Sequence, residues 1–285
     1  VFEQATNATA FNVNGANTNL LDNTNGLNRL QNGFSSITIG RADGTQSIAV
    51  GALTFNDPVT IRTAMGNINL NGALAGAGDA SITLTPGPAS RVLFNANGTI
   101  LSTAGQNITI NGAARVGEGF ASTVSTGAGA GNISITGLVD GTNGGAAETV
   151  IFNAGTGSLT TGVLGAGQAL DLETITITNA GITTLGGVNT LGTFSTTNAL
   201  TGAFNATGAV TANTLTLNGT SFDFDAAASA TSGAFTIGNT AATTLNFDST
   251  LTGAAGGISL SGSAITLGGL ASTSGAGNIA ITNSG

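Results

Sequence analysis

A short motif, Gly-Asn-Ile-x-Ile-x-Gly, recurs along this 285-residue chain and restricts the folds open to it. The copy at residues 131–137 matches the motif in full, and the others vary it; in most of them two apolar residues alternate with polar residues between Gly or Asn, a pattern typical of a short strand with one buried face. The copies begin at residues 66, 106, 131, 256 and 277. These intervals fit a structural unit of about 20–25 residues with imperfect length, as solenoids have.

Further short strands are expected between the copies of the motif, and helices are not. Strong helix formers such as Glu and Gln are scarce, and 46 Gly residues interrupt the windows of helical length. Short β-branched runs in which polar and apolar residues alternate recur instead. The expected strands include residues 36–39, 59–61, 81–84, 174–177 and 214–217.

We interpret this all-β pattern as a parallel β-helix, or β-solenoid, of about a dozen coils and roughly 60 Å in length. Ile, Leu, Val and Phe would point inward, Thr, Ser and Asn outward, and Gly and Asn would form corners of positive φ. Asn97 and Asn218 would stack between coils. The alternatives are a β-propeller or a β-sandwich, and a sandwich would have longer, more aromatic strands. Phe is the only aromatic type in the chain.

Two segments stand apart from this pattern. Residues 1–34 are rich in Asn and weakly periodic, so we expect an N-terminal cap or linker there and a solenoid repeat domain over residues 35–285. Residues 221–225 alternate strictly, which predicts Phe222 and Phe224 in the core and the two Asp residues between and after them in solvent. The chain begins with Val, which we interpret as a processed product or an excerpt of a longer protein.

The composition excludes much of enzyme chemistry. There is no His, Cys, Trp, Tyr or Lys, so the chain offers no imidazole base, thiolate nucleophile or Schiff-base amine.

The formal net charge of −8 disfavours binding to nucleic acid or to an anionic membrane. All five Arg lie in residues 1–115 with five acids, whereas residues 116–285 hold eight acids and no base. No apolar run is long enough for a membrane-spanning helix.

Two carboxylate pairs are the candidates for polysaccharide hydrolysis, which needs two such groups several ångströms apart. Asp171 and Glu173 share one strand face, as do Asp223 and Asp225, with roughly 7 Å between the members of each pair. Solvated polar positions on alternating strands explain both pairs better than a catalytic site does. Because sugar-stacking Trp and Tyr are missing as well, we expect no enzymatic activity and no catalytic residue.

A calcium ion is the one metal that the sequence suggests. Residues 140–144 read Asp-Gly-Thr-Asn-Gly, an oxygen-rich turn in which Asp140 and Asn143 are the candidate ligands. An ordinary Asx or Gly turn is the favoured explanation of this segment, and no other cofactor is expected. Ion pairs of Arg41 with Asp43, or of Arg62 with Asp57, are also expected at the corners of coils.

One region of the chain resembles a known family. Residues 33–44, Gly-Phe-Ser-Ser-Ile-Thr-Ile-Gly-Arg-Ala-Asp-Gly, and residues 53–61, Leu-Thr-Phe-Asn-Asp-Pro-Val-Thr-Ile, resemble segments of filamentous-haemagglutinin-type bacterial surface adhesins. The Gly-Asn-Ile-x-Ile-x-Gly copies extend the similarity over most of the chain. The resemblance implies a right-handed parallel β-helix, export, and a role in surface adhesion or in a fibrous coat.

These observations predict a non-catalytic, extracellular structural fibre or surface coat. The chains would associate end to end or side by side, because a β-helix has two open ends with unpaired strand edges. The alternative is a modular adhesin for cells, surfaces or polysaccharide, with recognition at residues 1–34 or 140–147. A secreted polysaccharide-active enzyme is the third possibility.

Overall fold

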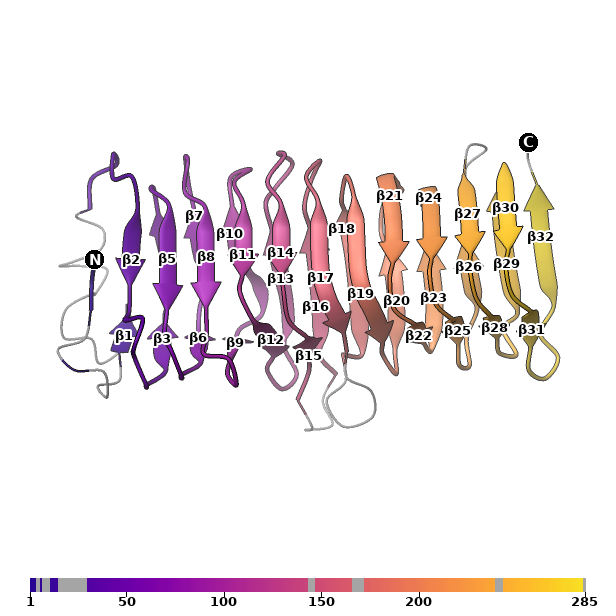
Figure 1. Cartoon of the computed structure of the whole chain (residues 1–285), viewed down its shortest axis with the longest axis horizontal. Helices are drawn as coiled ribbons and strands as arrows, with labels where there is room; N and C mark the ends of the chain where they lie inside the picture. The colour runs from indigo at the N-terminus through magenta and orange to yellow at the C-terminus, as the bar shows by residue number, and fades with distance from the viewer. Residues whose placement is uncertain are drawn as a thin grey trace.

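The fold is a rod of parallel β-strands that wind around a common axis (Figure 1). The computed structural model describes residues 1–3, 6, 11–14, 30–142, 147–165, 172–238 and 243–283. The regular elements in these residues are strands, β1 to β32, and none is a helix, so no described segment can cross a membrane as a helix. The prediction of a parallel β-solenoid is confirmed, and its right-handed winding stays a prediction.

Each coil contributes one strand to each of three faces. Face 1 contains β2 (Ile37–Ile39), β5 (Val59–Arg62), β8 (Ile82–Thr85), β11 (Ile108–Ile110), β14 (Ile133–Ile135), β17 (Leu159–Leu164), β19 (Thr183–Asn189), β21 (Leu200–Ala206), β24 (Gly219–Phe224), β27 (Thr244–Phe247) and β30 (Ala264–Leu267). Face 2 contains β1 (Phe11–Val13), β3 (Ile48–Val50), β6 (Ile68–Leu70), β9 (Arg91–Phe94), β12 (Ala113–Val116), β15 (Val139–Asp140), β22 (Val210–Ala212), β25 (Ala228–Ala230), β28 (Leu251–Gly253) and β31 (Ala271–Thr273). The long strands β17 and β19 continue from face 1 onto face 2 and join the two faces into one 21-stranded sheet.

Face 3 is a separate sheet with 11 strands, one for each coil. Its strands are β4 (Leu53–Phe55), β7 (Leu74–Gly76), β10 (Gly98–Thr103), β13 (Ala121–Ser125), β16 (Thr149–Asn153), β18 (Thr174–Asn179), β20 (Thr193–Thr196), β23 (Thr214–Leu217), β26 (Phe235–Ile237), β29 (Ile258–Gly262) and β32 (Ile279–Asn283). Strand partners in neighbouring coils show how many residues each coil contains. Ile175 and Phe194 are partners across a short coil, whereas Val124 and Phe152 are partners across a much longer one. The number of residues per coil therefore varies more widely than the predicted range of about 20–25.

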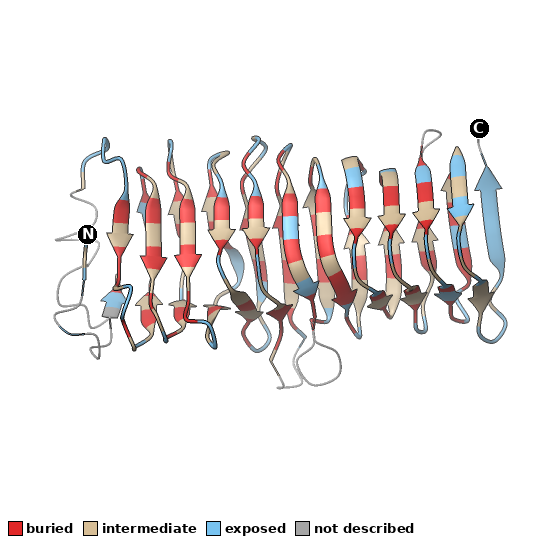
Figure 2. Cartoon of the chain, in the orientation of Figure 1, coloured by how far each residue is buried: buried red, intermediate tan, exposed pale blue. Residues whose placement is uncertain are grey.

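The core follows from the alternation of residues along each strand (Figure 2). Inward positions carry Ile, Leu, Val and Phe, and most of these side chains are completely buried. Phe222 and Phe224 are 1% and 0% exposed, as predicted, and Phe224 stacks on Phe247 of the next coil with ring centroids 5.0 Å apart. Because each coil is too thin to bury its apolar side chains alone, the core forms only when coils stack.

The recurring motif marks strands and not one particular face. Its copy at residues 66–72 forms β6 on face 2, and the copies at 106–112 and 131–137 form β11 and β14 on face 1. The copies at 256–262 and 277–283 form β29 and β32 on face 3. The same sequence thus serves any side of the coil, because every side needs two inward apolar residues.

Gly and Asn have different roles at the corners. Among the described residues, positive φ occurs at 14 Gly and at one other residue, Asn14. Gly238 combines a φ of +79° with a site where an added Cβ would lie 1.9 Å from the Ser261 carbonyl oxygen of the next coil. Asn side chains instead bind the neighbouring coil: Asn107 Oδ1 accepts from the backbone N–H of Asn132, at 2.8 Å. Within the described residues, the prediction that Asn also forms positive-φ corners therefore holds only at Asn14.

The two ends of the rod differ in how far they are covered. At the N-terminal end, Phe2 forms a bridge with Ile39 and β1 pairs with β3, so described parts of residues 1–34 extend the sheet. The predicted boundary at residue 34 stays a prediction. At the C-terminal end, β32 pairs with β29 alone among the described strands, and its residues are exposed (Figure 2).

Candidate functional site

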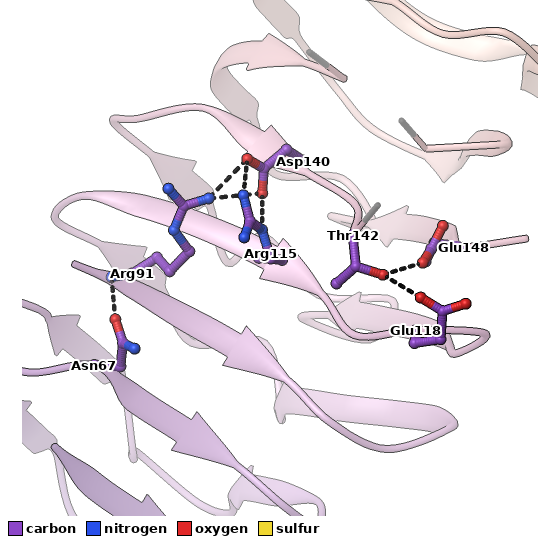
Figure 3. Close-up of polar contacts among 7 residues, drawn as sticks. All are labelled: Asn67, Arg91, Arg115, Glu118, Asp140, Thr142 and Glu148. Atoms are coloured by element: carbon purple, nitrogen blue, oxygen red, sulfur yellow. Dashed lines mark hydrogen bonds and ion pairs between the residues drawn. The ribbon is translucent and has the colours of Figure 1, made fainter. Parts of the chain in front are cut away.

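An ion cluster on face 2 forms around the buried carboxylate of Asp140 (Figure 3). Asp140 accepts from Arg115 Nε and NH2, both at 2.8 Å, and from Arg91 NH1 at 2.7 and 3.0 Å. The Asp140 side chain is 1% exposed, whereas those of Arg91 and Arg115 are 27% and 21% exposed. One carboxylate thus satisfies two guanidinium groups, and the cluster carries one net positive charge.

The stacking of coils explains how these three residues meet. Arg115 and Asp140 are direct partners in the pairing of β12 with β15. Arg91 begins β9, one coil earlier, and its backbone N–H donates to Asn67 Oδ1 at 2.9 Å. The cluster therefore ties three successive coils together. The hydrogen bonds to Asp140 raise the pKa of Arg115 further above its usual range, although burial opposes this shift.

A second polar group lies beside this cluster (Figure 3). Thr142 Oγ1 lies 2.5 Å from Glu148 Oε1 and 2.9 Å from Glu118 Oε2. Glu148 is only 3% exposed. A hydroxyl has one hydrogen, so Thr142 donates to one carboxylate at a time.

The structure describes one of the two predicted calcium ligands, Asp140. Both oxygens of Asp140 face guanidinium groups, which compete with any cation for the same lone pairs. Asn143 lies outside the described residues. The geometry of Asp140 thus favours a structural ion cluster, and calcium binding stays a prediction.

The predicted carboxylate pairs have different surroundings. Asp223 is half-buried on β24 and Asp225 is exposed, as expected, and Asp248 of the next coil joins them, with the ligand oxygens of all three within 4.8 Å. The Asn246 amide donates to Asp223 at 2.8 Å and to Asp248 at 2.9 Å. Glu173 is exposed, and its predicted partner Asp171 lies outside the described residues.

The predicted corner ion pairs are half correct. Arg41 Nε contacts Asp43 Oδ1 at 2.8 Å, and this hydrogen bond holds the pKa of Asp43 below its usual range. The prediction that Arg62 pairs with Asp57 is wrong. Arg62 contacts Glu3 at 3.9 Å, whereas Asp57 is buried and accepts from the Gly33 backbone N–H at 2.8 Å.

Sequence reasoning missed the arginine cluster, although a signal for it exists. Arg91, Arg115 and Asp140 follow one another at nearly equal intervals in the sequence; Arg115 and Asp140 are one coil apart, and Arg115 lies two residues beyond Ala113, the partner of Arg91 one coil on. Charged residues are so rare in the chain that such regular spacing of three of them marks a stacked group. Asp223 and Asp248 are separated by a similar interval.

Comparisons with known proteins give no relative for this chain. No protein-family model matches it, and neither the curated proteins nor the solved structures contain a match.

Proposed function

We propose that this chain is a structural β-solenoid of an extracellular fibre or surface coat, built from rods that associate through their ends. One observation carries the proposal: the described coils stack in parallel into one continuous rod, the architecture of a fibre. The resemblance to filamentous-haemagglutinin-type adhesins, with its right-handed winding and export, supports the same proposal.

The geometry of β32 supports association with a further strand. The N–H of Ile258 donates to the Asn278 carbonyl oxygen at 2.8 Å, so even-numbered residues of the last strand direct their backbone groups toward β29. The N–H and C=O groups of Ile279 and Ile281 therefore point away from the rod, and their side chains are 43% and 48% exposed. An edge with free backbone groups and apolar side chains favours the addition of another strand.

Electron microscopy over a range of protein concentrations tests this proposal. The expected result is thin rods about 50 Å long at low concentration and longer filaments of the same width at high concentration. Ile281→Lys should shorten the filaments, because it places a charge on the open edge. Thr109→Lys, an outward substitution in the middle of face 1, should leave them unchanged. Compact particles at all concentrations would refute the proposal.

A modular adhesin for neutral polysaccharide is the second candidate, and the surface of face 1 favours it. A single column of hydroxyl side chains runs in register along seven consecutive coils of this face. Its members are Thr38, Thr60, Thr83, Thr109, Ser134, Thr160 and Thr184. Such a column can follow an extended sugar chain with one hydroxyl for every coil. Co-sedimentation with insoluble polysaccharides tests this role, and the protein remaining in the supernatant would argue against it.

A further inference from the structure

A second hydroxyl surface, on face 3, is two-dimensional. On three successive strands a Thr or Ser stands on each side of a buried apolar residue: Thr-Ile-Thr in β18, Thr-Phe-Ser in β20 and Thr-Leu-Thr in β23. The strand pairings place these residues in two straight columns. One column holds Thr149, Thr174, Thr193 and Thr214, and the other holds Thr176, Ser195, Thr216, Thr236 and Ser259.

The hydroxyl groups of this array are directed to solvent. Thr176 and Ser195 share a hydrogen bond of 3.4 Å, and the other seven side-chain hydroxyls have no protein partner among the described residues. The intervening residues Ile175, Phe194 and Leu215 are completely buried, so the backbone beneath the array is held by the core. The Thr side chains of the array have restricted χ1 freedom, which limits the positions of their hydroxyl and methyl groups.

The array is also free of charge. Strands β16, β18, β20, β23, β26, β29 and β32 contain no Asp, Glu or Arg, although the surrounding residues 116–285 carry eight acids. The described acids of this region lie at corners or on the other faces. In Figure 1 these strands lie side by side along the rod. The result is a neutral surface with a repeat of about 4.8 Å between strands and about 6.6 Å along each strand.

The chemistry of the surface favours ordered water over a sugar chain as the ligand. Because the chain contains no Trp or Tyr for stacking, hydroxyl groups alone would hold a sugar chain only weakly, on this face as in the single column of face 1. Rigidly spaced hydroxyl and methyl groups instead hold water molecules at fixed positions, and the cost of ordering that water is small when the groups are already immobile. Oxygen atoms on a prism plane of hexagonal ice also lie on a rectangular lattice, so water ordered on this rectangular array of hydroxyl groups can join such a plane.

We propose that the face 3 array, formed by the nine residues named above, binds the surface of ice through ordered water. This activity is separate from the assembly of fibres, because the array lies on the side of the rod and not at its ends. A rod that assembles end to end would present the same array repeatedly along its length.

Ice-affinity partition and growth of single ice crystals test the proposal with the full chain. The intact protein should enter slowly growing ice and lower the temperature at which a crystal grows below its melting point. Thr193→Lys, in the centre of the array, should abolish both effects. Thr83→Lys makes the same change on the single column of face 1 and should retain them. Unchanged thermal unfolding midpoints would show that both variants fold.

Each result of these ice-binding experiments leads to a different conclusion. Exclusion of the intact, folded protein from ice would overturn the inference and leave the fibre proposal standing. Equal loss of ice binding in both variants would overturn the assignment to face 3. Binding to insoluble cellulose or chitin that Thr193→Lys abolishes, without ice binding, would identify the array as a polysaccharide site and also overturn the inference.

Discussion

The substitution Asp140→Asn probes the ion cluster that ties three coils together. It removes the only carboxylate that contacts Arg91 and Arg115 among the described residues, and it leaves two guanidinium groups facing each other. Breaking a buried ion pair by removing one partner costs about 3–5 kcal/mol. Because the two Arg side chains are 27% and 21% exposed, water partly compensates them, and we expect the lower end of that range, about 3 kcal/mol.

Urea unfolding followed by circular dichroism measures this change. Asp223→Asn is the matched control, because Asp223 also points outward from a strand but lies beside Asp225 and Asp248. The control should alter the free energy of unfolding by no more than about 0.5 kcal/mol. A loss of less than about 0.5 kcal/mol for Asp140→Asn would refute the view that the cluster stabilises the stack.

An apolar replacement of the whole cluster separates stability from specificity. Buried ion clusters are often no more stable than apolar groups of similar volume, since desolvation offsets their attraction. The triple variant Arg91→Met, Arg115→Met and Asp140→Leu should therefore regain most of the stability that Asp140→Asn loses. If the triple variant is as unstable as Asp140→Asn, the charges themselves hold the coils together.

Four other predictions follow from the same structure. Phe224→Ala should cost about 3–5 kcal/mol in urea unfolding because it leaves a cavity beneath Phe247, whereas Phe34→Ala, at a side chain 48% exposed, should cost little. Arg41→Gln should raise the pKa of Asp43 toward its ordinary value of about 3.9 in an NMR titration. Because the folded-state pKa of Asp43 is lowered, the contribution of this pair to stability should be complete above the ordinary pKa and should vanish as the pH falls through the folded pKa. An Asp43 pKa that Arg41→Gln leaves unchanged would contradict the assignment. Chelation by EDTA should leave the thermal unfolding midpoint unchanged, because guanidinium groups already occupy both oxygens of Asp140, and a fall in the midpoint would show a stabilising ion. Trypsin acting on the unfolded chain should leave a limit fragment that begins at Val116, since no Arg or Lys follows Arg115, and cleavage beyond that point would contradict the sequence.

The fold was predictable because its determinants are local. Alternation of apolar and polar residues decides which side chains point inward, and it does so within a few residues, as in Ile68–Leu70 and Ile133–Ile135. Gly at corners has an equally local cause, since positive φ is a property of one residue. The assignment of a strand to a particular face was not predictable, because the same motif serves all three.

The ion cluster was harder to predict because it depends on register over two coils. Coil length changes along the rod, so a small error in one coil changes which side chains become neighbours in the next. Arg62 illustrates the consequence: Asp57 is near in sequence but its carboxylate turns inward to Gly33, and Arg62 instead contacts Glu3. Contacts between coils follow the stacking and not the distance along the chain.

Diffraction from aligned filaments tests the central claim most directly. In a rod of stacked parallel coils the strands run across the filament axis, so the spacing between strands repeats along that axis. We predict a strong reflection at about 4.8 Å on the meridian, parallel to the filaments. The absence of filaments, or the same reflection on the equator, would contradict the account.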